Sequence, residues 1–353
     1  MYLWSLTIKM NHNKPVIIWL LSGCFLIFIM VVVGGITRIT DSGLSMVKWE
    51  LFMGAIPPLN NLQWEEVFTL YQQSPEGKKL NYNFTLSEFK YIYFWEYLHR
   101  MIGRLLGLVF IIPFIIFLIK KKLNSKLIKQ SIILLILGGM QGAIGWWMVK
   151  SGLIDNPHVS HYRLSIHLIV AFLTCAFTFW VALPLIYTKK LKGDKKISQL
   201  LILYFILVII QIIYGAFVAG LDAGEGFNTW PKMLGEWMPE SVYIDANGYN
   251  PIWFLEHRWG VQFIHRKLAL VIFIFTFYIW AKGRKSTINI IQRKSLNLIA
   301  LLVITQSIVG VLTLVYGVPI TLASIHQIIA FSLLMSIVYS LFLFKEIKLK
   351  TYQ

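Results

Sequence analysis

Long apolar runs are the feature that most constrains how this chain can fold. Eight segments of roughly 20 or more mostly apolar residues occur in its 353 residues, at about 15–37, 92–119, 127–149, 161–187, 197–220, 257–281, 292–315 and 319–345. A helix of about 20 residues crosses the ~30 Å hydrocarbon core of a bilayer. The chain is 57% hydrophobic and only 14% charged, unlike a soluble globular protein. The pattern predicts an all-α integral membrane protein with eight transmembrane helices.

Positive charge is concentrated between these runs. Of the 33 Lys and Arg residues, 20 lie with only two acidic residues in the segments 1–14, 120–129, 188–199, 282–294 and 345–353. Short basic loops stay on the cytoplasmic side of a membrane. We therefore expect a multi-pass protein of the inner (plasma) membrane with both termini and these three loops in the cytoplasm. Because topology accounts for the net charge of +17, we expect no nucleic-acid partner.

Four sequence matches, always in the same order, relate the two halves of the chain. They are GGITRITDSG (34–43) with GAFVAGLDAG (215–224), EYLHRMIGRLLG (96–107) with QFIHRKLALVIF (262–273), QGAIG (141–145) with QSIVG (306–310), and SIHLIVAF (165–172) with SIHQIIAF (324–331). Four spans followed by four in the same orientation form a parallel repeat. The repeat predicts two pseudo-symmetric four-helix bundles, residues 1–190 and 191–353.

Four histidines occupy matched positions: His99 and His167 in the first half, His265 and His326 in the second. All four fall on spans expected to run from outside to inside, at a depth of ~10–13 Å. A polar side chain at that depth costs free energy unless it is paired or liganded. Two facing imidazoles per bundle are what a six-coordinate haem iron requires. We therefore expect each bundle to hold one haem, with these histidines as its axial ligands.

A histidine inside a membrane span need not bind haem. A single one more often forms a hydrogen bond with a neighbouring helix, but four in two matched pairs favour haem. A zinc or copper site is disfavoured because no Cys, Met or carboxylate cluster completes a coordination sphere. The remaining histidines, which have no partner in the other half, are His12, His158, His161 and His257.

Basic residues follow the histidines in each half. Arg100 and Arg104 come after His99, and Arg266 and Lys267 come after His265. Guanidinium and ammonium groups bind carboxylates, so these residues are candidates to contact haem propionates. Arg38 is a further candidate for a contact with a haem edge. The alternative is that these cations only reach toward the membrane interface.

One matched position differs in its chemistry. Glu96 lies three residues before His99, on the same helix face, and its counterpart in the second half is Gln262. A carboxylate beside a porphyrin could act as a base or stabilise positive charge, whereas an amide can do neither. The asymmetry predicts that the first bundle is the reactive one. The alternative is a glutamate that is exposed to water or paired with Arg100.

At these residues the sequence resembles the haem A synthase family. The resemblance covers nearly the whole chain and rests on GGITRITDSGLSMVKWE, FWEYLHRMIGRLLG, SIHL, SIHQ and QFIHRKLA taken together. The long first outer loop contains no cysteine, and both cysteines of the chain, Cys24 and Cys175, fall within spans. In this respect the chain is similar to the proteobacterial and mitochondrial branch, which lacks an outer cysteine pair.

The resemblance implies haem b in the C-terminal half on His265 and His326, and haem O as the substrate bound by His99 and His167. It implies oxidation of a ring methyl of haem O to the formyl group of haem A by successive hydroxylations, with oxygen from water and electrons relayed through haem b. Glu96 would stabilise a cationic methylene or deprotonate the incoming water. Haem O synthase and cytochrome oxidase assembly are the implied partners. The electron acceptor and the oligomeric state, including a homo-oligomer, stay open.

Two other functions compete with this interpretation. A di-haem membrane cytochrome that only transfers electrons would explain the four histidines but not the difference between Glu96 and Gln262. A transporter would also suit a parallel repeat, but it predicts ionisable residues near the membrane midplane. The spans beyond the histidines are almost purely apolar, which disfavours transport.

Overall fold

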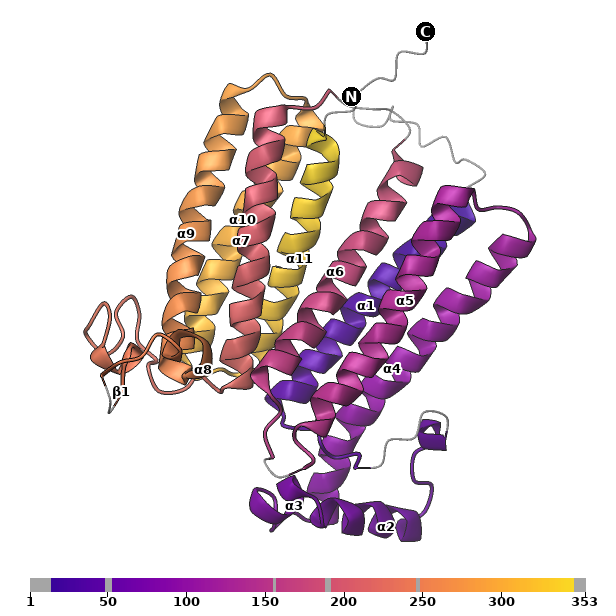
Figure 1. Ribbon diagram of the computed structural model, residues 1–353, viewed down its shortest axis with the longest axis vertical. Helices are drawn as coiled ribbons and strands as arrows, with labels where there is room; N and C mark the ends of the chain where they lie inside the picture. Colours follow the sequence, from indigo (N-terminus) through magenta and orange to yellow (C-terminus); the bar gives the residue numbers. More distant parts are fainter. Residues whose placement is uncertain (1–13, 48–52, 155–156, 188–191, 246–247, 346–353) are drawn as a thin grey trace.

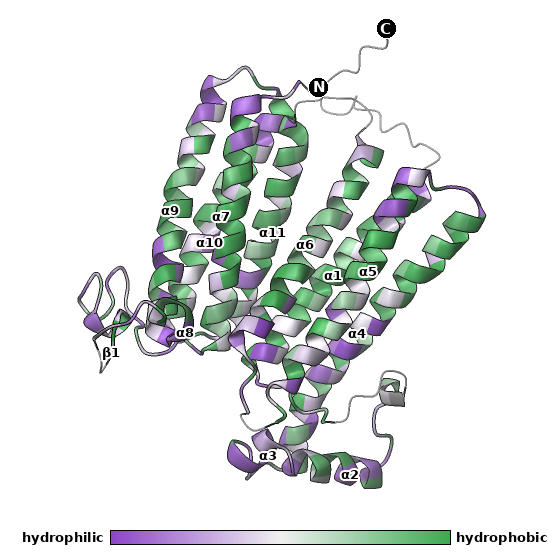
Figure 2. Cartoon of the chain, in the orientation of Figure 1, coloured by the Kyte–Doolittle hydropathy of each residue, from purple (hydrophilic) through white to green (hydrophobic). Residues whose placement is uncertain are grey.

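Eight long helices dominate the computed structural model, which describes residues 14–47, 53–154, 157–187, 192–245 and 248–345. Within these ranges the helices long and apolar enough to cross a membrane are α1 (Lys14–Ile39), α4 (Leu86–Ile119), α5 (Ser125–Lys150), α6 (His161–Ile186), α7 (Lys195–Gly220), α9 (Arg258–Lys285), α10 (Ile290–Val315) and α11 (Ile320–Phe344). Their middle portions are almost uniformly hydrophobic (Figure 2). The prediction of eight transmembrane helices is confirmed.

The helices form two groups that lie side by side (Figure 1). In the first group, α1 and α5 each contact both α4 and α6; in the second, α7 and α10 each contact both α9 and α11. The histidine-bearing helices α4 and α6 are therefore diagonal partners, as are α9 and α11. Contacts of α6 with α7 and α11, and of α1 with α11, join the groups. The boundary predicted at residue 190 lies outside the described residues and stays a prediction.

The two ends of the molecule differ. One end carries η1 (Met53–Ala55), α2 (Asn61–Gln72) and α3 (Pro75–Lys79) below the first group, and η2 (Glu240–Val242), β1 (Ile244–Asp245), β2 (Gly248–Tyr249) and α8 (Trp253–Glu256) below the second (Figure 1). We call this the lid end. The lysine-rich link between α4 and α5 and the basic last turn of α9 lie at the opposite end, which we call the basic end (Figure 1).

We call the segments outside the spans at the lid end, residues 40–85 and 221–257, the lids of the first and the second group. Helix α4 extends into the lid of the first group. It begins at Leu86, not at the predicted residue 92, because Thr85 and Glu88 form a capping box. The Glu88 Oε2 accepts the Thr85 N–H at 2.8 Å, and the Thr85 Oγ1 accepts the Glu88 N–H at 3.3 Å. The extra turn buries Phe89 against Tyr71 of α2. The lid of the first group is thereby fixed to the same helix that carries Glu96 and His99.

The two cysteines lie opposite each other within the spans. Cys24 of α1 and Cys175 of α6 are free thiols, and each Sγ lies near the backbone carbonyl oxygen of the other residue, at 3.9 and 3.7 Å. Their positions inside transmembrane helices agree with the prediction. They act here as small side chains that let α1 and α6 approach each other.

Candidate functional site

Each of the four matched histidines packs against a glycine on a neighbouring helix. The pairs are Gly34 with His99, Gly145 with His167, Gly215 with His265, and Gly310 with His326. A Cβ atom added at these glycines would lie 2.9, 3.2, 3.3 and 2.7 Å from the Cε1 atom of the respective imidazole. Any larger residue would push the ring aside. The four glycines are also matched between the halves, so the repeat retains both the ring and the space for it.

The two imidazoles of each half approach each other across their bundle. His99 and His167 lie close enough to interact electrostatically, and so do His265 and His326. The Nδ1 atoms of His99, His167 and His326 are buried and have no hydrogen-bond partner. A buried nitrogen without a partner is costly, and a metal-bound ring avoids part of that cost. The residues present therefore fit a bis-histidine haem in each bundle.

Glutamine side chains contact the histidines. The Nε2 of Gln211 lies 3.1 Å from the Nδ1 of His265 and also donates to the His265 carbonyl oxygen at 3.1 Å. The Nε2 of Gln306 lies 3.2 Å from the Nε2 of His326. The Nε2 of Gln141 donates to the His167 carbonyl oxygen at 3.4 Å. The contacts of Gln211 and Gln306 with ring nitrogens orient the His265 and His326 rings, whereas Gln141 contacts only the backbone of His167.

Glu96 is buried at the lid end of the first bundle, with only 3% of its surface exposed. Its Oε1 accepts a hydrogen bond from Arg100 Nη2 at 2.5 Å, which is also an ion pair. Its Oε2 accepts hydrogen bonds from Ser45 Oγ at 2.7 Å and from the Met46 N–H at 2.8 Å. All three partners are donors, as an ionised carboxylate requires. Glu96 is therefore paired with Arg100 and not exposed to water.

Gln262 takes the equivalent place in the second bundle, where its Oε1 accepts a long hydrogen bond from Arg266 Nη1 at 3.5 Å, but it differs from Glu96 in also donating one. It is 2% exposed, and its Nε2 donates to the Ala223 carbonyl oxygen at 2.8 Å. A carboxylate there would face that oxygen with no proton to share. The surroundings of each position therefore suit its own side chain, and among the described residues a buried carboxylate lies beside the histidines in the first bundle only.

Comparison with known proteins decides the family. The family model described as cytochrome oxidase assembly protein matches residues 17–338. The chain belongs to the haem A synthase family. It is 50% identical over 340 residues to the haem A synthase of Flavobacterium psychrophilum, covering 96% of this chain and all of that protein. The corresponding enzymes of Flavobacterium johnsoniae (94% of this chain, 98% of that protein) and Nitrosospira multiformis (90% of each) are 49% and 42% identical.

The basic residues that follow His99 and His265 have described contacts within the protein. Arg100 lies beside the histidine layer and also donates to the Met46 carbonyl oxygen at 3.1 Å, while Arg104 Nη1 lies 3.7 Å from the Met101 Sδ. In the second half, Arg266 donates to the lid carbonyl oxygens of Thr229 and Pro231, at 2.8 and 3.1 Å. The Lys267 Nζ lies 5.2 Å from the ring centre of Trp237. Their contact with haem propionates stays a prediction.

Arg38 joins the two halves at the lid end. Its Nη1 pairs with Asp41 at 2.6 Å, and its Nη2 pairs with Asp222 of the second half at 2.7 Å. The same Nη2 donates to the Ala219 carbonyl oxygen at 2.7 Å. Asp41 and Asp222 are the matched aspartates of the repeat, and both have a positive φ, 48° and 49°. The haem-edge role predicted for Arg38 is untested; its observed contacts connect the bundles.

Two of the remaining histidines, His161 and His257, have other partners. The His161 Nε2 lies 3.2 Å from the Leu255 carbonyl oxygen, and His257 stacks on Trp253 with ring centres 3.8 Å apart. His12 lies outside the described residues, as do residues 48–50 at the end of the first family motif.

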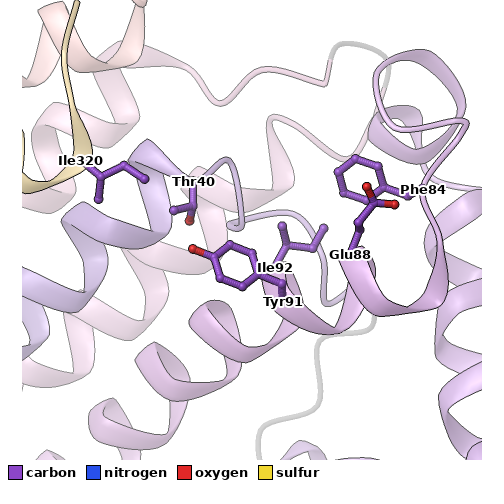
Figure 3. A pocket seen from close by; sticks show the side chains of 6 residues that line it. All are labelled: Thr40, Phe84, Glu88, Tyr91, Ile92 and Ile320. Carbon is purple, nitrogen blue, oxygen red and sulfur yellow. The ribbon is translucent and has the colours of Figure 1, made fainter. Parts of the chain in front are cut away.

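Two cavities open at the lid end. The larger, about 350 Å³, is lined by Thr40, Phe84, Glu88, Tyr91, Ile92 and Ile320, so it lies where α4 and the end of α1 face the start of α11 (Figure 3). The smaller, about 180 Å³, is lined in part by Met46 and Arg100, two residues that hold Glu96. The smaller cavity is therefore the one adjacent to the candidate reactive group.

Sequence reasoning missed several contributors to the site. Ser45 and Met46, which hold Glu96, follow the matched D-x-G motif but have no signal of their own. Gln211 has Met30 as its counterpart, so the repeat gave no hint of its contact with His265. The glycines facing the histidines could have been found, because they are matched in the repeat and close approach of helices requires small residues.

Proposed function

We propose that this protein is a haem A synthase that oxidises a ring methyl of haem O to the formyl group of haem A. The observation that carries the proposal is a difference in side-chain chemistry between two otherwise matched sites. Each bundle presents two imidazoles across its centre, but among the described residues only the first adds a buried carboxylate, Glu96, where the second has Gln262. Relatives named haem A synthase that align with at least 90% of this chain support the same conclusion.

The two bundles take different roles in this proposal. His99 and His167 bind the substrate haem O, and His265 and His326 bind haem b, which supplies an acceptor for electrons when present. The second site has features suited to a permanent cofactor. Gln211 contacts the His265 ring and Gln306 contacts the His326 ring, whereas the glutamine contact described for the histidines of the first half is that of Gln141 with the His167 carbonyl oxygen.

Glu96 prepares the first site for a reaction that removes electrons from a methyl group. Each hydroxylation by water forms a carbon–oxygen bond and releases a proton pair and an electron pair. A fixed carboxylate stabilises positive charge that develops on the methyl carbon, and a carboxylate is also a base that can take a proton from the attacking water. The three donors around Glu96 hold it in place and occupy most of the acceptor positions of the carboxylate, which favours the electrostatic role.

The orientation in the membrane follows from charge. We assign the basic end to the cytoplasm and the lid end to the outside of the cell, because short basic loops are retained inside. The reactive groups then lie near the outer leaflet. Family membership connects the chain to cytochrome oxidase assembly, and a haem O synthase is the enzyme class that must supply its substrate.

Analysis of bound pigment tests the proposal and separates it from a di-haem electron-transfer cytochrome. The wild-type protein is purified from cells that make haem O, and the extracted haems are identified by mass. A synthase yields haem b together with haem O, its hydroxylated form or haem A, whereas a cytochrome yields unmodified haem only. His265→Ala is expected to remove haem b, and His99→Ala is expected to remove the haem O series; the reverse assignment, or haem b alone in every sample, refutes the proposal.

A further inference from the structure

The smaller cavity at the lid end of the first bundle is lined by a positively charged residue, Lys150, that has no role in the site described above. Its walls come from α4 and the segment after α1, which supply Arg100 and Met46, and from the last turn of α5, which supplies Trp146 and Lys150. The Lys150 Nζ lies 5.1 Å from the centre of the Trp146 ring. Both residues are exposed, and the indole face attracts the ammonium group toward the side of the cavity.

The charges around this cavity do not cancel. Arg100 is paired with Glu96, and both side chains are nearly buried, at 11% and 5% exposed. Within the described ranges, Lys150 forms no ion pair with a carboxylate. The described wall residues together with Glu96 therefore leave one net positive charge facing a space of about 180 Å³. Such a space admits a carboxylate group with its bound water.

The second bundle lacks this arrangement. The QGAIG and QSIVG match places Val311 and Val315 at the positions of Trp146 and Lys150. Its Arg266 is instead bound by lid carbonyl oxygens. The ammonium groups of Lys232 and Lys267 in the second half lie against Trp237, in the segment after α7. The pair of Trp146 and Lys150 on the helix behind the cavity is thus described for the bundle that holds Glu96, the one whose ligand must bind before reaction and leave afterwards.

We propose that Lys150 anchors a propionate carboxylate of the substrate porphyrin in this cavity, and that it is a determinant of substrate binding. The proposal rests on the proposed function, because it takes the first bundle as the substrate site. The ammonium group forms a charge-assisted hydrogen bond with the carboxylate, and Arg100 lines the same cavity while it holds Glu96. Substrate anchoring at Lys150 therefore places the porphyrin edge next to the reactive carboxylate.

The test compares two ligands and four proteins. Haem O and its propionate dimethyl ester are titrated into detergent-solubilised protein that retains its haem b, and the dissociation constant is read from the change in absorbance. The proteins are the wild type, Lys150→Met, Lys150→Arg and, as a control, Lys126→Met at the basic end of the same helix. The haem b content of each preparation shows independently whether the variant is folded.

Loss of one charge-assisted hydrogen bond is expected to weaken haem O binding to Lys150→Met about tenfold. Lys150→Arg and Lys126→Met are expected to bind like the wild type. The ester is expected to bind the wild type about tenfold more weakly than haem O, and Lys150→Met equally weakly. The anchor is overturned if Lys150→Met binds haem O as tightly as the wild type does. It is also overturned if the substitution weakens the binding of haem O and of its dimethyl ester by the same factor. Either result leaves the proposed function standing. A wild type that binds no haem O refutes both.

Discussion

Gly35 of α1 packs directly against the side-chain amide of Gln327 of α11, the residue that follows the ligand candidate His326. The Gln327 Nε2 donates a hydrogen bond to the Val31 carbonyl oxygen at 3.0 Å. The preceding residue, Gly34, faces His99. Gly34 and Gly35 are neighbours on α1. Through them the backbone of α1 contacts His99 of the first bundle and Gln327, beside His326, of the second.

This contact predicts that Gly35→Ala destabilises the association of the two bundles. An added Cβ would overlap the Gln327 amide, and overpacking of this kind costs about 1–3 kcal/mol. The expected result is a lower midpoint temperature for unfolding in detergent. Gly107→Ala is the matched control, because a Cβ there meets no atom within 4 Å. The double variant Gly35→Ala/Gln327→Ala should recover most of the loss; additive losses in this double-mutant cycle would contradict the contact.

The sequence predicted much of this architecture because a bilayer restricts the choices. The eight spans and the four histidines at matched positions follow from hydropathy and from the repeat. Contacts that form where the chain reverses direction could not be predicted from the sequence. Nothing in the pattern places Ser45 and the Met46 N–H on Glu96, since those bonds require the turn after α1 to fold back onto α4.

The lid is where prediction from sequence failed most. The segment between the first two spans contained no long apolar run, so it was expected to be a loop, yet it folds into α2 and α3 and packs Tyr71 against Phe89. The start of α4 was misplaced for the same reason. Polar residues such as Glu88 lowered the hydropathy of its first turns, although the Thr85 capping box favours a helix there.

The glycines that face the histidines predict a separable loss of the two haems. Gly34→Val should displace the His99 ring and abolish binding of haem O while leaving haem b in place. Gly310→Val should displace His326 and remove haem b. The haem content of each purified variant, measured by pyridine haemochrome spectra and mass, checks both results. Gly138→Val, where an added Cβ meets no atom within 4 Å, should retain both haems. Loss of the same haem from both variants would contradict the assignment of the sites.

The difference between Glu96 and Gln262 predicts that Glu96→Gln loses catalytic activity but keeps its cofactor. In Glu96→Gln an amide NH₂ would meet the Met46 N–H or Arg100, and the stabilising charge would be absent. The rate of conversion of haem O should fall by about 10²–10³, the usual effect of removing one electrostatic group. Haem b content and haem O affinity should change little. Normal production of haem A by Glu96→Gln would contradict a catalytic role for this carboxylate.

A second buried carboxyl, Glu76, lies in the lid between α2 and α4. It is 3% exposed, and its Oε2 is buried without a hydrogen-bond partner. Burial is the main cause that raises the pKa of Glu76 to about 8, and the nearby charges of Glu96 and Asp41 raise it further, while a hydrogen bond with Tyr71 opposes the shift. Glu76 is therefore mostly protonated at neutral pH in the folded lid.

This raised pKa predicts that the lid loses stability as the pH rises. In an unfolded lid the Glu76 carboxyl would ionise near its ordinary pKa of 4.5, whereas the folded lid keeps the proton up to about pH 8. Between these values the unfolded state binds fewer protons, so its free energy falls relative to the folded state with each step in pH. Hydrogen exchange of the α2 and α3 amides should therefore become faster, after correction for intrinsic rates, from pH 5 to pH 8. Glu76→Gln should flatten this dependence, and Glu65→Gln, an exposed control on α2, should keep it. An unchanged slope in Glu76→Gln would show that another group controls the lid.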